Sequence, residues 1–206
     1  LKSKHIWIIA ISGTFLYTSL SVFGELWGKS FLEQAYHLSK LESATTMSML
    51  FLGWAVGAPL SGYWSDHSGH RLFPLFIGAI GSLILISFIL YDQHLSYHSL
   101  NIVMFLYGLF SATEIIVFIM AKEYSPTQEL SGTIFAVTNM IISFGGVVFQ
   151  PLVGRLLDWS SPVIIHEHIR VYSTSNYQMG LTLIPVSMLM VMLLITYMSL
   201  CSKKPV

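Results

Sequence analysis

Charged residues are what this sequence of 206 residues has least of. Asp, Glu, Lys and Arg together make up 10% of the chain, whereas 54% of the residues are hydrophobic. A water-soluble domain carries roughly 25% charged residues, so the composition excludes an ordinary soluble protein. It predicts a polytopic membrane protein, in which lipid surrounds most side chains. Ten acidic and ten basic residues balance, so net charge indicates no nucleic-acid partner.

Cysteine is nearly absent too, because Cys201 is the only one in the chain, and this excludes an internal disulfide. We find no nucleotide loop, haem motif or nucleophile–base arrangement, so we expect no enzyme, no catalytic residue and no cofactor. The motif "HEH" at residues 166–168 offers two histidines, but a zinc site needs three or four ligands, and we expect no metal site. The chain begins "LKSKHIW" without methionine, which favours a fragment of a longer product.

Long apolar runs are abundant, and each has the length of about 20 residues that a membrane-spanning helix needs. They cover residues of about 6–27, 43–64, 72–91, 99–121, 132–157 and 179–200. These runs are too long for barrel strands. The expected fold is therefore an all-α membrane protein in which residues 1–206 form one domain of six transmembrane helices.

An even number of spans places both chain ends on one side of the membrane. That side would hold six basic residues and the opposite side four; the six are Lys2, Lys4, Arg71, Lys122, Lys203 and Lys204, and the four are Lys29, Lys40, Arg155 and Arg170. Basic residues gather on the cytoplasmic side of membrane proteins. The difference is small, and it favours cytoplasmic termini.

The loop "GYWSDHSGHR", residues 62–71, is unusually polar for this chain. Gly62 would let the end of the second span approach a neighbour closely, and Gly69 would supply the positive φ that reverses the chain. Asp66 is placed to contact the positive end of a helix, and Arg71 to pair with a carboxylate or with helix-end carbonyls. The alternative interpretation is a solvated hairpin, in which such residues are common.

Small residues indicate two special helix faces. Gly53, Gly57 and Ser61 recur at four-residue spacing in the second span, which is typical of close helix packing. In the fifth span, "FGGVVFQP" with its proline at residue 151 predicts a bend or a local loosening of the helix.

Polar side chains inside the spans are the candidate functional residues. Glu114 lies near the middle of the fourth span, where insertion of a carboxylate costs about 2.5–3.5 kcal/mol, so we expect it to face protein or water. Tyr107, Ser111 and Glu114 follow one another at steps of four and three. The first span has a similar polar stripe, with steps of four, three and four, formed by Thr14, Thr18, Ser21 and Glu25. The candidate substrate and proton pathway comprises Glu114, Ser111, Tyr107, Tyr17, Thr18, Ser21, Glu25 and Asn139.

Structural interpretations of these polar residues remain open. Glu114 could be hydrogen-bonded to a neighbouring helix for packing, and Glu25 could reach the outer interface. The amides of Asn139 and Gln150 often tie helices together in membrane proteins.

The loop pattern G-x-x-x-D-x-x-G-x-R, formed by Gly62, Asp66, Gly69 and Arg71, resembles the cytoplasmic loop motif of the major facilitator superfamily, G-x-x-x-D-[RK]-x-G-[RK]-[RK]. Here His67 and His70 replace two basic positions, which suits the weaker copy of the motif between helices eight and nine. The segments "LGWAVGAPLSGYWSD", "KEYSP" and "TNMIISFGGVVFQPLVGRLLD" also look like the C-terminal half of bacterial members.

The resemblance implies helices seven to twelve of a twelve-helix secondary transporter in the inner membrane. The partners would be the absent N-terminal six-helix half, a small-molecule substrate and the lipid bilayer. Asp66 would dock on a helix end of that other half, and the first and fourth spans would line a central cavity. Transport would proceed by alternating access, and proton coupling, as in a symporter, stays open. A six-helix scaffold or assembly subunit that transports nothing is the alternative.

Overall fold

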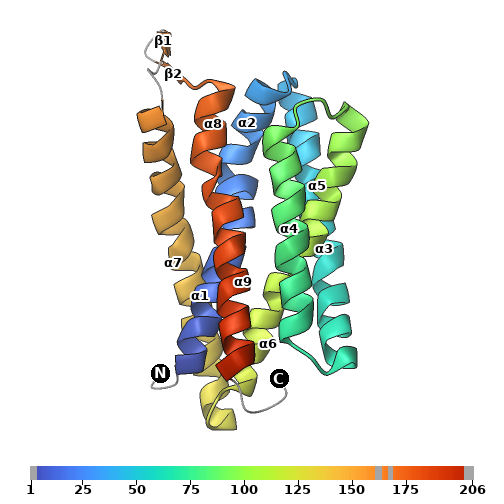
Figure 1. Ribbon diagram of the computed structural model, residues 1–206, viewed down its shortest axis with the longest axis vertical. Helices are drawn as coiled ribbons and strands as arrows, with labels where there is room; N and C mark the ends of the chain where they lie inside the picture. Colours follow the sequence, from blue (N-terminus) through green and yellow to red (C-terminus); the bar gives the residue numbers. More distant parts are fainter. Residues whose placement is uncertain (1–3, 161–163, 167–168, 202–206) are drawn as a thin grey trace.

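The computed structural model describes residues 4–160, 164–166 and 169–201, and helices make up most of them (Figure 1). In chain order the helices are α1 (Lys4–Thr18), the π-helix η1 (Ser19–Trp27), α2 (Gly28–Ala35), α3 (Lys40–Ser68), α4 (Leu72–Tyr91), α5 (Tyr97–Ser111), the 3₁₀ turn η2 (Ala112–Glu114), α6 (Ile115–Glu123), α7 (Gln128–Ser160), α8 (Thr174–Leu181) and α9 (Leu183–Cys201). Two short antiparallel strands, β1 (Ile164–His166) and β2 (Ile169–Val171), lie between α7 and α8.

Five helical stretches in the described part of the chain are long and apolar enough to cross a membrane. They are Lys4–Ala35, Leu72–Tyr91, Tyr97–Glu123, Gln128–Ser160 and Thr174–Cys201. The remaining predicted span, at about 43–64, lies within α3. This helix has 29 residues and is long enough to cross a membrane, but it is not among the five. Several Ser, Thr and Gly residues make α3 more polar than the others. The predicted helical membrane bundle is confirmed.

One end of the bundle carries both ends of the chain. Figure 1 shows the start of α1, the end of α9, the α3–α4 turn and the α6–α7 turn together at this end. The polar loop of residues 62–71 therefore lies at the same end as the termini, as expected for an even number of spans. Three of the basic residues used in the charge comparison, Lys2, Lys203 and Lys204, lie outside the described residues.

The closest helix packing joins α3 to α5. A Cβ added at Gly57 would lie 2.5 Å from the carbonyl oxygen of Leu109, and one at Gly53 would overlap the carbonyl oxygen of Phe105. From the other side, a Cβ at Gly108 would overlap the carbonyl oxygen of Leu50. The small-residue face predicted in the second span is thus a surface of close backbone contact.

The fifth span was predicted to bend or loosen locally, and the structure shows no loosening in its secondary structure, while the bend stays a prediction. α7 is a single α-helix from Gln128 to Ser160 with Pro151 inside it. Gly145 packs directly on Thr14 of α1, where an added Cβ would collide with the threonine methyl group. The backbone departs from α-helical geometry in the first span instead, at η1.

Candidate functional site

The π-helix η1 interrupts the first span where its polar residues lie. The backbone N–H of Gly28 bonds to the carbonyl oxygen of Phe23, five residues back, in place of the α-helical partner four residues back. π-Helices are rare and occur frequently at functional sites. Because each turn holds more residues than in an α-helix, the stripe that sequence spacing places on one face does not continue in register to Glu25.

Glu25 is exposed and is held by two neutral donors. The hydroxyl of Tyr17 donates to Glu25 Oε1 at 2.9 Å, and Gln150 Nε2 lies 3.5 Å from Glu25 Oε2. Gln150 Nε2 also donates to the carbonyl oxygen of Ser21 at 2.7 Å, and Trp27 Nε1 donates to the carbonyl oxygen of Gln150 at 3.2 Å. Gln150 of α7 is therefore tied to η1, which confirms the expected helix-tying role of its amide.

Glu114 is the buried carboxyl group of the site. It ends the 3₁₀ turn η2 between α5 and α6 and is 5% exposed. Its side chain forms no hydrogen bond with the residues that the structure describes. The alternative of a carboxyl that bonds to a neighbouring helix stays a prediction. Glu114 interacts electrostatically with Glu25, and Tyr17 lies within range of both carboxyl groups.

The other predicted pathway residues lie in different surroundings. The hydroxyls of Thr18 and Ser21 are buried and donate to carbonyl oxygens of their own helix, those of Phe15 and Tyr17. Asn139 is exposed on α7. None of these three side chains shares a described hydrogen bond with the carboxyl groups of Glu25 and Glu114.

Tyr107 and Ser111 face the interior of the bundle. The ring of Tyr107 is fully buried and packs edge-on against Phe23, and its hydroxyl has no hydrogen-bond partner among the described residues. Ser111 Oγ lies 3.3 Å from Ser82 Oγ of α4. Of the residues predicted for the pathway, the structure joins Tyr17 and Glu25 by a hydrogen bond, and Glu114 lies within electrostatic range of both. Sequence reasoning gave too little weight to Gln150.

Arg71 of the polar loop joins the ends of two helices. It forms an ion pair with Asp66, and its Nη1 donates to Ser65 Oγ at 3.1 Å. Its Nε and Nη2 also donate to Glu123 Oε1 at the end of α6, at 3.0 and 2.6 Å. The hydrogen bond to Glu123 is the main reason why the pKa of Arg71 is raised. Sequence analysis missed Glu123, although it belongs to the segment "KEYSP" and follows an apolar run.

The two glycines of the loop differ from one another. Gly69 has a φ of 67°, which confirms the predicted left-handed turn. The close neighbour predicted for Gly62 is absent from the described residues, because nothing lies within 4 Å of a Cβ added there. The contact of α3 with α5 lies nearer the middle of the helix, at Gly53 and Gly57, so Gly62 is left on an open face.

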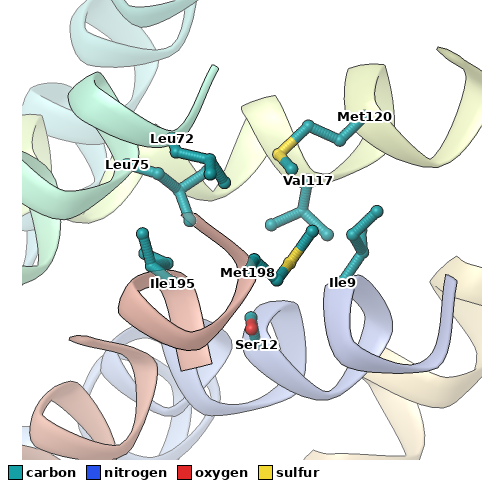
Figure 2. Close-up of a pocket in the computed structure, with 8 residues that line it drawn as sticks. All are labelled: Ile9, Ser12, Leu72, Leu75, Val117, Met120, Ile195 and Met198. Carbon is teal, nitrogen blue, oxygen red and sulfur yellow. The ribbon is translucent and has the colours of Figure 1, made fainter. Parts of the chain in front are cut away.

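A small cavity lies away from these residues (Figure 2). Its volume is about 10 Å³, and it is lined by Ile9, Ser12, Leu72, Leu75, Val117, Met120, Ile195 and Met198 of α1, α4, α6 and α9. Ser12 is the one polar side chain in this lining, and its hydroxyl has no partner among the described residues. A buried water needs two to four polar partners, so the cavity is a gap in apolar packing.

The described residues include no group of three or more His, Cys, Asp or Glu side chains that could hold a metal ion. The "HEH" segment lies partly outside the described residues, since residues 167 and 168 are not among them.

A known protein family matches a large part of this chain. The family model described as Major Facilitator Superfamily matches residues 1–150 of this chain. The matched region includes α1 to α6, the loop of residues 62–71 and most of α7. No curated protein matches the chain.

Proposed function

Because this match covers more than half of the sequence, the chain belongs to the major facilitator superfamily, and we propose that it is the C-terminal six-helix half of a secondary active transporter. Members of this family are transporters rather than enzymes, and the chain is a transporter-type, multi-pass membrane protein. In the proposal, an N-terminal six-helix half packs against this bundle in the inner membrane, and the termini of the chain are cytoplasmic. A small solute then crosses by alternating access.

The observation that carries the proposal is the burial of Glu114 without a partner. A carboxylate inside the membrane is unfavourable by about 2.5–3.5 kcal/mol, and ionisable residues there are usually functional. Glu114 has no hydrogen bond among the described residues, and its electrostatic interaction is with another acid, Glu25. A purely structural scaffold has no use for such a group. A transporter can use it to bind and release a proton as the cavity opens to each side.

The loop of residues 62–71 supports the second part of the proposal, the alternation between two conformations. Arg71 links Asp66 to Glu123, and the Asp66 side chain is still 63% exposed. Gly62 has open space beside it. We propose that Gly62 and Asp66 meet a helix of the N-terminal half when the cytoplasmic side is closed, and separate from it when that side opens. A contact of about 1–2 kcal/mol is enough to bias two conformations that differ by a few kcal/mol.

The test uses the complete transporter in proteoliposomes that contain a pH-sensitive dye. Solutes from a panel of amines, amino acids, sugars and organic acids are added outside, and the pH of the lumen is recorded. We expect at least one solute to acidify the lumen, as in proton symport. Glu114→Gln should abolish the pH change, because the amide cannot carry the proton.

Glu129→Gln is the matched control, since it makes the same chemical change at an exposed site in the first turn of α7. It should leave the pH change intact. Solute uptake with an unchanged lumen pH would refute proton coupling. A protein that moves no solute in the panel would favour the scaffold instead.

A further inference from the structure

We propose that Glu25, held by Tyr17 and Gln150 beside the π-helix, binds the positively charged group of the transported solute, which is therefore an organic ammonium ion. The proposal deepens the proposed function and depends on it.

The first step is the way in which Glu25 is held. Its two donors, the Tyr17 hydroxyl and the Gln150 amide, are neutral, so they orient the carboxylate and leave its negative charge uncompensated. The amide of Gln150 is fixed in turn by its hydrogen bond of 2.7 Å to the Ser21 carbonyl oxygen. A carboxylate offers about four acceptor positions, so an exposed Glu25 with these two donors can still accept from a ligand.

The second step is the lack of a counter-ion within the bundle. The ion pairs among the described residues are Lys29–Glu33, Arg71–Asp66 and Arg71–Glu123, and none includes Glu25 or Glu114. Lys29 lies four residues after Glu25, but it pairs with Glu33 at 3.9 Å. Charges removed from water need a partner of opposite sign.

The third step concerns a second acidic residue near Glu25. Glu114, on a different span, is 5% exposed, has no hydrogen-bond partner among the described residues and interacts electrostatically with Glu25. The ionised Glu25 attracts a cation and repels an anion, and Glu114 adds to this field only when it is ionised. Because Tyr17 lies within range of both, a ligand next to Tyr17 experiences the field of the pair.

Aromatic rings near Glu25 favour an organic cation over a metal ion. The ring of Phe51 lies against Gly24, where an added Cβ would be 3.3 Å from Cζ, and Phe51 is 44% exposed. Tyr17 supplies a second ring, whose hydroxyl bonds to Glu25, and Trp27 donates to the backbone of Gln150, the other donor to Glu25. Ammonium groups bind favourably over such rings. A metal ion of the Ca²⁺ type takes six or more oxygen ligands, and the described residues include no group of acidic or histidine side chains suited to hold one.

The experiment measures equilibrium binding of radiolabelled 2-phenylethylammonium to the complete transporter in lipid nanodiscs. The competitors are 2-phenylethanol and phenylacetate, which have the same aromatic body but no charge or a negative charge. We expect unlabelled 2-phenylethylammonium to displace the label and the other two to fail.

Glu25→Gln should weaken binding by roughly tenfold to a hundredfold, because it removes a charged hydrogen-bond acceptor. Glu25→Asp keeps the charge and should recover part of the affinity. Glu33→Gln is the matched control on the same continuous helical stretch, and it should bind like the wild type. Should Glu25→Gln fail to fold, Tyr17→Phe removes one donor and leaves the charge, so its binding should fall only severalfold.

Unchanged binding in Glu25→Gln would overturn the proposal, as would displacement of the label by phenylacetate or by an equal concentration of Na⁺. If neutral or anionic solutes change the lumen pH in proteoliposomes while no amine binds, the proposed transport function stands and the ammonium site is refuted. If amines bind through Glu25 but no solute moves, Glu25 is an ammonium-binding site, and both its role in transport and the proposed transport function are refuted.

Discussion

The close packing of α3 on α5 predicts a large difference between two identical substitutions on one helix. In Gly57→Ala, the new Cβ would lie 2.5 Å from the Leu109 carbonyl oxygen and 2.8 Å from the Ala112 Cβ. Cβ atoms essentially never come within 3.0 Å of another heavy atom in this way, so α3 and α5 must separate by at least about 0.5 Å. Overpacking of this kind destabilises a protein by about 1–3 kcal/mol.

Gly62→Ala is the matched control, because nothing lies within 4 Å of its added Cβ. Both substitutions gain helix propensity, worth up to about 1 kcal/mol. We therefore expect the free energy of unfolding of Gly57→Ala to lie about 1–3 kcal/mol below that of Gly62→Ala. The measurement is reversible unfolding in mixed micelles, followed by tryptophan fluorescence. Equal stabilities for the two variants would show that α3 and α5 are not in backbone contact at this position.

Three further predictions concern single polar side chains. Ser12→Ala should raise the free energy of unfolding by about 1 kcal/mol, because it removes a buried hydroxyl that has no partner among the described residues and lies in an apolar cavity. The measurement is thermal unfolding. A loss of stability would mean that the hydroxyl is hydrogen-bonded. Arg71→Gln should lower the free energy of unfolding by no more than about 1 kcal/mol, since the partners of Arg71 are partly exposed. Salt at roughly 1 M screens surface ion pairs and should reduce the difference from the wild type. A difference that does not depend on salt would contradict an electrostatic origin. Hydrogen bonds to Ser39 lower the pKa of Glu42, so its contribution is present above the usual glutamate pKa and is lost as the pH falls through the lowered value. The stability difference between wild type and Glu42→Gln should consequently shrink in acid, and a difference that grows in acid would show that the sign is wrong.

Sequence alone was sufficient for the membrane class of the fold. Runs of about 20 apolar residues are a property of consecutive residues, and in lipid such runs form helices because their backbone groups must be satisfied internally. The four-residue spacing of Gly53 and Gly57 likewise predicted a close helix contact, since residues four apart share one face of a helix. The positive φ at Gly69 followed from the need to reverse the chain within a few residues.

The contents of the site depended on how the helices are rotated against one another. Spacing assigned Glu25 to the stripe of Thr14 and Thr18, but η1 changes the register of the helix before Glu25 is reached. Likewise, Ser111 is three residues from Glu114, yet its hydroxyl lies beside Ser82 of α4. Helical periodicity assumes 3.6 residues per turn, so it cannot anticipate a π-helix or a 3₁₀ turn.

What the sequence determined by itself was the number of apolar stretches, their lengths and the polar residues within them, because these depend on the chemistry of neighbouring residues. Only the tertiary structure decided that Arg71 reaches Glu123, that Gln150 holds η1 beside Glu25, and that Glu114 has no partner in the described bundle. These residues are far apart in the chain, and their contacts arise from the packing of whole helices. The balance of helix contacts sets that packing, and no single segment contains the information.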